Sequence, residues 1–178
     1  MDSPDISNLS IGKGILYFTP TGGSERDMGE CSAFETTPSG DTLDYFSNRV
    51  GIKKKVRSVV TSTSLGIRIV ANEITAENLA MALGGDTPAS GGSGIKSFNI
   101  MRKTEVTGSL RFEGQNDIGN RLDVSLPSVS FKPGGTFNPL SEEWQEIEIN
   151  GEALAVENTD GTSDFGSVTV NDEANHLA

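Results

Sequence analysis

The sequence is poor in the residues that most often carry chemistry. Its 178 residues include one cysteine, Cys31, and one histidine, His176, close to the C-terminus. A single cysteine makes neither an internal disulfide nor a Cys-x-x-Cys motif, and a histidine so near a chain end is a poor basis for a Ser-His-Asp or Cys-His device. No Gly-x-Ser-x-Gly nucleophile motif occurs either. We therefore expect no enzyme activity, no cofactor and no metal site.

Long apolar runs and basic residues are also scarce. No run approaches the roughly 20 apolar residues that span a bilayer, and residues 1–10 are acidic and polar, so we expect a soluble protein made inside the cell, without a membrane partner. Fourteen basic and 25 acidic residues give a net charge of -11, which disfavours binding to nucleic acid. Residues 133–178 contain no lysine or arginine, whereas a basic segment comprises Arg49, Lys53, Lys54, Lys55 and Arg57. Opposite charges in two segments favour contacts within the chain or between copies of it.

The sequence does contain a period-two alternation of apolar and polar residues, which is typical of strands with one buried and one solvated face. It is clearest over 105–113 and 121–132, and the Gly- and Asn-rich segment 114–120 between them is typical of a hairpin loop. Pro127 indicates a bulge or bend in the second strand. Further strands are predicted over 14–19, 32–37, 56–63, 65–71, 95–102, 144–149 and 166–170.

One segment alone is predicted as helix. Thr75 can cap it, an apolar stripe from Leu79 to Leu83 follows, and Gly84 ends it. One short helix beside about nine or ten strands predicts a mainly β fold, a β-sandwich or barrel with one flanking α-helix. We expect a single domain over 1–178, with 1–12 as a flexible N-terminal segment.

Three stretches are predicted as long loops: 38–48, 86–94 and 152–164. Loops of this length in a small domain are usually functional or disordered. The first carries Leu43, Tyr45 and Phe46, large apolar side chains that are unfavourable on an unattached loop. We expect this loop to dock on its own body or on a neighbouring molecule.

Several acidic and glycine-rich motifs are better explained as ordinary structure. The clusters at 116–120 and 157–164 lack the spacing of a helix-flanked calcium loop, and Asn, Asp and Gly form turns in any case. Residues 91–96 lack the Gly-Lys-Ser/Thr ending of a phosphate-binding loop, because Ile95 and not glycine precedes Lys96. The glutamates at 142–148 fit the solvated face of a strand better than a catalytic pair.

Six segments, taken in their order, carry a family resemblance: 14–20 (GILYFTP), 27–37 (DMGECSAFETT), 42–48 (TLDYFSN), 73–84 (EITAENLAMALG), 144–149 (WQEIEI) and 164–170 (DFGSVTV). In this order they resemble the tail tube proteins, or major tail proteins, of long-tailed bacteriophages (siphophages). The resemblance spans nearly the whole chain. Longer members of the family have a second, outward-facing domain after the last of these segments, which this sequence does not show.

The resemblance implies a tail-tube-like, ring-forming β-sandwich, with six copies in a ring and rings stacked into a tube. It implies a structural subunit of the virion tail, assembled in the host cytoplasm, whose lumen conducts the genome during ejection without binding DNA specifically. The implied partners are further copies of the chain, a tape-measure protein and tail-tip proteins. An acidic lumen suits this role because carboxylates repel phosphates.

Two sets of residues follow from the resemblance and the strand pattern. Segment 38–56 matches the place of an extended assembly loop, and the expected subunit contacts are Leu43, Tyr45, Phe46, Arg49, Lys53, Lys54, Lys55 and Arg57. The lumen is expected along the polar faces of 105–113 and 121–125, with Glu35, Glu113 and Asp123 as candidates.

Two other functions fit the same sequence. A secretion-system tube subunit, or another virion component, can share a ring-forming fold. A monomeric β-sandwich module that binds a carbohydrate or a protein predicts an aromatic-lined groove, for which the chain offers Trp144, two tyrosines and eight phenylalanines. The basic segment is too short, and too poor in aromatic residues, to be a nucleic-acid patch.

Overall fold

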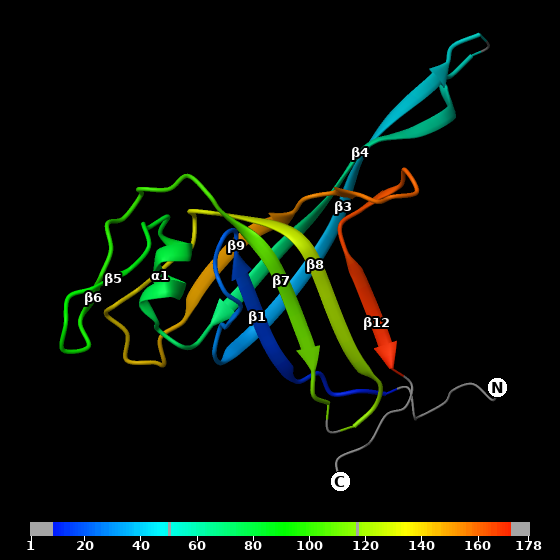
Figure 1. The fold of residues 1–178 in the computed structure, drawn as a ribbon. Helices are drawn as coiled ribbons and strands as arrows, with labels where there is room; N and C mark the ends of the chain where they lie inside the picture. Colours follow the sequence, from blue (N-terminus) through cyan, green and yellow to red (C-terminus); the bar gives the residue numbers. More distant parts are fainter. Residues whose placement is uncertain (1–8, 50, 117, 172–178) are drawn as a thin grey trace.

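The computed structural model describes residues 9–49, 51–116 and 118–171, so most of the predicted flexible N-terminal segment and His176 lie outside the described residues. Within them the chain is mainly β with one α-helix (Figure 1). All the strand pairs found there are antiparallel. This confirms the predicted mainly β fold class. No helix in the described part is both long and apolar enough to cross a membrane.

The main sheet has the strand order β2-β1-β7-β8-β9-β4-β3, and β12 also pairs with β8. Its strands are β1 (Gly14–Pro20), β2 (Arg26–Asp27), β3 (Cys31–Ser47), β4 (Lys54–Ala71), β7 (Val106–Gly114), β8 (Arg121–Lys132), β9 (Ile147–Ala153) and β12 (Ser167–Asn171). Two small ribbons lie outside it: β5 (Ala89–Ser90) with β6 (Lys96–Ser97), and β10 (Val156–Glu157) with β11 (Ser163–Asp164).

Strand β8 bends at Pro127 and joins two layers of the sheet. One edge of β8 pairs with β7, while the other pairs first with β12 and then, beyond Pro127, with β9. The register with β7 shifts between Gly108 and Leu110, opposite Pro127, which confirms the predicted bulge, because proline has no N–H to give to the ladder. In Figure 1, β1, β7 and β12 form the front layer, and β3, β4 and β9 cross behind it.

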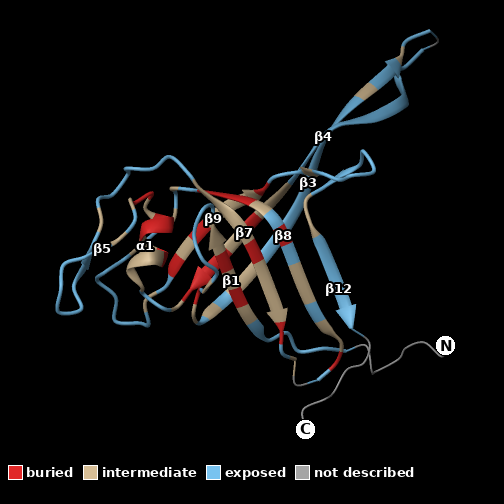
Figure 2. Ribbon diagram, viewed as in Figure 1, coloured by how far each residue is buried: buried red, intermediate tan, exposed pale blue. Residues whose placement is uncertain are grey.

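The apolar core fills the space between these two layers. Phe18 of β1 and Phe131 of β8 are almost fully buried and meet edge to face, with ring centroids 5.6 Å apart. Ile69 of β4 and Ile149 of β9 are fully buried from the rear layer. Figure 2 shows buried residues concentrated in the body and in α1 (Ala76–Ala82), which covers one end of the core. Removing this apolar surface from water is the main driving force for the fold.

The helix begins where the sequence predicts. The Thr75 hydroxyl accepts a hydrogen bond from the Asn78 N–H at 3.1 Å, which satisfies one free donor of the first turn. The Asn78 side chain is fully buried, donates to the Met28 and Glu73 carbonyls, and accepts from the Arg26 guanidinium. These bonds fix α1 against the segment around β2. The predicted N-cap is therefore confirmed.

Three predicted strand or loop boundaries are wrong. Of the strand predicted over 95–102, only Lys96–Ser97 is extended, and Met101 has a φ of 56° that no strand accommodates. The strand predicted from Trp144 begins at Ile147. The loop predicted over 152–164 contains the end of β9 and the small β10–β11 ribbon. In the first two cases, apolar residues spaced as in a strand are exposed instead of packed in the core.

The loop predicted over 38–48, and with it the extended assembly loop over 38–56, is also wrong as a description of structure. β3 and β4 pair from Cys31 opposite Ala71 out to Ser47 opposite Lys54, and the connecting turn covers only the residues between these two strands. The result is a long two-stranded hairpin whose outer part projects away from the body (Figure 1). We call this outer part, residues 39–49 and 51–63, the arm.

Candidate assembly surfaces

The arm exposes apolar side chains on both of its faces. Leu43 lies opposite Val59 and Tyr45 opposite Arg57, so these residues share one face, while Phe46 follows Tyr45 and points to the other face. The exposed fractions are 68% for Leu43, 66% for Tyr45 and 49% for Phe46. Figure 2 shows the arm as almost wholly exposed. Among the residues that the structure describes, neither face of the arm therefore has a covering layer.

The arm also carries the basic segment, and most of its charge is unpaired. Lys55 is the exception, since its Nζ lies 2.8 Å from Asp44 Oδ1. This contact and the Ser58 hydroxyl lower the pKa of Asp44. The side chains without an ion pair among the described residues are Arg49, Lys53, Lys54 and Arg57. The structure thus brings all eight predicted contact residues together on the arm.

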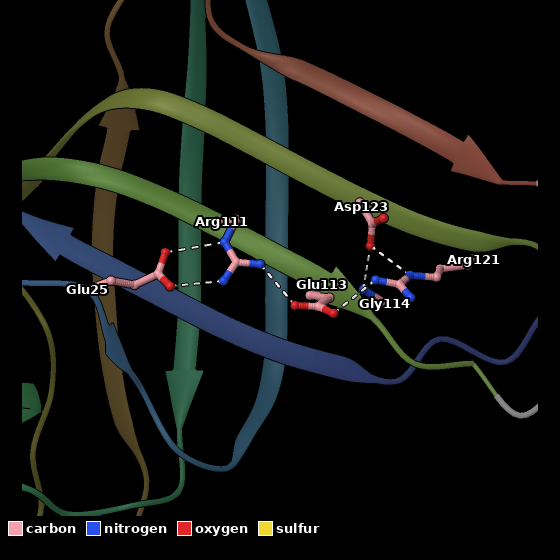
Figure 3. A network of polar contacts seen from close by, with 6 residues as sticks. All are labelled: Glu25, Arg111, Glu113, Gly114, Arg121 and Asp123. Carbon is pink, nitrogen blue, oxygen red and sulfur yellow. Dashed lines mark hydrogen bonds and ion pairs between the residues drawn. The ribbon is translucent and has the colours of Figure 1, made fainter. Parts of the chain in front are cut away.

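Two of the three lumen candidates belong to one ion-pair network on the front layer (Figure 3). Glu113 accepts from Arg111 at 2.9 Å and from Arg121 at 3.0 Å. Asp123 accepts from Arg121 Nε at 3.1 Å and from the backbone N–H of Gly114 at 3.0 Å. Side chains alternate between the two faces of a strand, so Arg111 and Glu113 of β7 share a face. Glu113 lies directly opposite Asp123 of β8, which brings the charged side chains of the two strands together.

Glu25 completes this network from outside the strands. Its carboxylate accepts from Arg111 Nε at 3.3 Å and from Nη2 at 3.0 Å, a two-pronged pairing that lowers the pKa of Glu25. The two partners Glu25 and Glu113 raise the pKa of Arg111, which also lies 4.2 Å from the centre of the Tyr17 ring. Three carboxylates therefore pair with two guanidinium groups, and both guanidinium groups have ion-pair partners.

Glu35, the third lumen candidate, lies on the other outer face of the molecule. Its carboxylate accepts from Arg68 at 3.3 Å, and Arg68 also donates to Glu148 of β9 at 3.2 Å. The rings of Phe34 on β3 and Phe112 on β7 meet in the core, with their centroids 5.7 Å apart. Because neighbouring side chains on a strand point to opposite faces, Glu35 and Glu113 point away from each other. The structure therefore does not bring the three candidates together.

The long strand β3 and the short strand β12 each have one edge without a strand partner among the described residues. β3 pairs only with β4, and β12 pairs only with β8. On β12, Val168 is 63% and Val170 52% exposed. An edge with free N–H and C=O groups and exposed apolar side chains is a template for pairing with another chain.

Sequence reasoning missed several of these residues. Glu25 lies 86 positions from Arg111 and belongs to no predicted strand, so no local pattern links the two. Arg111 and Arg121 sit on the polar faces of β7 and β8, and the alternation alone could have placed them beside Glu113.

Comparisons with known proteins add little. No protein-family model and no curated protein matches the sequence. One solved structure contains a chain that is similar to this protein; it is described as "Tail of empty GTA particle computed with helical refinement, C6 symmetry". The two chains are 13% identical and have a TM-score of 0.46, and the match covers 86% of this chain and 96% of that chain. A likeness at this level carries no argument about function.

Proposed function

We propose that this chain is a self-assembling structural subunit of a bacteriophage-type tail tube, forming stacked hexameric rings around an acidic lumen that conducts the genome. The tube and the ring of six come from the resemblance of the ordered sequence segments. The observation that carries self-assembly is the arm, a long ribbon with uncovered apolar side chains on both faces.

In a protein that stays monomeric, the exposed apolar side chains of the arm would remain in contact with water, which is unfavourable. A two-stranded ribbon without a covering layer is only marginally stable in water, and large exposed apolar patches mark surfaces that become covered. The arm carries Leu43, Tyr45 and Phe46 at exposed positions. A second copy of the chain is the covering partner that this proposal assigns.

The free sheet edges support closure into a ring. Strands β3 and β12 each offer an edge without a strand partner in the described part of the chain, and pairing such edges between copies joins the separate sheets into one wall. A head-to-tail contact of this kind closes into a ring when the rotation between copies allows it.

We assign the lumen to the front layer, with Glu113 and Asp123. One lumen can be lined by only one of the two outer faces, and Glu35 lies on the other. On the front face, Arg111 and Arg121 are both held by carboxylates. A phosphate passing this network meets three carboxylates and two guanidinium groups that are already paired, and such a surface suits a DNA conduit.

Negative-stain electron microscopy together with sedimentation velocity tests the proposal on the purified chain. We expect rings or hollow tubes whose proportion rises with protein concentration. A protein that stays monomeric at every concentration and ionic strength, without annular or tubular particles, would overturn the proposal and favour the monomeric binding module.

A further inference from the structure

A second exposed apolar surface lies at the opposite end of the molecule. It belongs to the segment between β8 and β9, where Trp144 is 95% and Leu140 88% exposed. Beside Trp144 is an open hollow of about 680 Å³ lined by Asn72, Ile74, Glu142, Glu143, Trp144 and Gln145. We call these hollow-lining residues and Leu140 the Trp144 surface.

The Trp144 surface is acidic and has no cation of its own. Glu142 and Glu143 form no ion pair among the described residues, and the chain has no lysine or arginine from residue 133 onward. An exposed tryptophan beside unpaired carboxylates is suited to a partner with both apolar and cationic groups, since the tryptophan face attracts cations as well as apolar side chains.

The tip of the arm has this complementary chemistry. Ile52 is 87% exposed in the turn, and Phe46, close to the end of β3, is 49% exposed. Lys53 and Lys54 follow directly, and neither side chain has an ion pair among the residues that the structure describes. Apolar and cationic groups at the tip therefore match apolar and anionic groups on the Trp144 surface.

The two surfaces lie too far apart to meet within one chain. Figure 1 shows the arm projecting from one end of the body, while the segment between β8 and β9 lies beside α1 at the other end. Two complementary surfaces at opposite ends of a molecule produce a head-to-tail contact, which repeats from copy to copy.

We propose that the Trp144 surface receives the arm tip of a second copy of this chain. Ile52 packs against Trp144, and Lys53 and Lys54 face Glu142 and Glu143. This inference rests on the proposed self-assembly and names the surface on the receiving copy.

A charge exchange between two variants tests this contact. In the first variant, Lys53→Glu/Lys54→Glu, the tip and the Trp144 surface are both acidic. In the second, Glu142→Lys/Glu143→Lys, both are basic. We expect each variant alone to need at least about a tenfold higher concentration to assemble than the original chain, because like charges then face each other. An equal mixture has opposite charges at every contact between the two variants, and we expect it to recover assembly.

The control reverses two acidic residues away from the Trp144 surface. Glu157→Lys/Asp160→Lys, at the exposed β10–β11 turn, makes the same change in net charge, and we expect it to assemble like the original chain. Sedimentation velocity at matched concentrations measures all samples.

The outcomes separate the contact from the proposed function. If the original chain assembles and the Glu142→Lys/Glu143→Lys variant assembles equally well, the receiving surface is wrong while the proposed function stands. If both variants lose assembly but their mixture fails to recover it, the direct pairing is also wrong. If the original chain itself never assembles, the proposed function fails.

Discussion

Truncating the two aromatic side chains of the arm, Tyr45→Ala/Phe46→Ala, should abolish assembly and leave the fold intact. Both side chains are exposed and belong to the arm, so the core does not depend on them. Substitutions at exposed positions of this kind change the free energy of unfolding by about 0.5 kcal/mol or less. Any large effect on assembly then reports the contacts of the arm with another copy.

The size of the effect follows from the area that the two side chains expose. With about 200 Å² per fully covered aromatic side chain, the exposed fractions of 66% and 49% leave roughly 130 Å² at Tyr45 and roughly 100 Å² at Phe46. At about 25 cal/mol per Å², covering both completely contributes about 6 kcal/mol, and covering half of this area about 3 kcal/mol. The association constant of the contact should therefore fall by at least about a hundredfold.

The assay is sedimentation velocity over a concentration series, with urea unfolding of each variant to verify the fold. Tyr45 and Phe46 point to opposite faces of the arm, so the two single variants show which face is covered. Ile11→Ala/Ile118→Ala removes apolar side chains with similar exposed fractions, 59% and 58%, and serves as the matched control. Assembly of the Tyr45→Ala/Phe46→Ala variant at the original concentration, or an equal loss in the control, would refute this reasoning.

Three further predictions concern the body of the protein. Phe131→Ala removes a fully buried ring that packs on Phe18, and urea unfolding should show a loss of about 3–5 kcal/mol; a loss below about 1 kcal/mol would contradict this packing. Burial raises the pKa of Cys31 to about 11, so at pH 8 only about one thiol in a thousand is ionised. A thiol reagent should react far more slowly with the folded than with the unfolded protein, and equal rates would contradict that environment. The pKa of Glu25 is lowered by Arg111 and that of Asp44 by Lys55. A lowered carboxyl pKa stabilises the folded state above the unfolded value of about 4, and this stabilisation is lost as the pH falls through the folded value. The unfolding temperature should be nearly constant from about pH 8 to pH 5 and fall below about pH 4; a rise on acidification would contradict these pairs.

Much of the fold could be predicted wherever a segment has one buried face. In β1, Leu16 and Phe18 are buried and Tyr17 between them is not, so the alternation is visible in the sequence. The β7–β8 hairpin and its bulge at Pro127 follow from the same pattern. The helix start follows from the local chemistry of Thr75, which needs no knowledge of the rest of the chain.

The β4 half of the arm is predicted as a strand over 56–63, but the β3 half could not be predicted as strand, because it has no buried face. Both sides of the ribbon are solvated, so apolar and polar residues do not alternate there, and Pro38, Gly40 and Asp41 have the composition of a turn. What makes this segment a strand is its ladder with β4, a partner that a local pattern does not reveal. The opposite problem occurs at Trp144, whose apolar character predicts a strand although its side chain is exposed.

The candidate sites also divide into residues that local sequence could group and residues that only the folded sheet brings together. The predicted contact residues lie together on the arm because they are close in the sequence. The lumen candidates lie on three strands, and only the folding of the sheet into two layers decides that Glu113 and Asp123 share a face and Glu35 does not. Such a placement depends on contacts between distant segments, as does the pairing of Glu25 with Arg111.

The central claim is that copies of this chain assemble through the arm, and removing the arm tests it most directly. Gly40 and Thr63 lie opposite each other in the hairpin, so an Asn-Gly turn can replace everything between them. Sedimentation velocity and negative-stain microscopy should show rings or tubes for the original chain and a folded monomer for the shortened one. Rings or tubes formed equally well without the arm would contradict the claim.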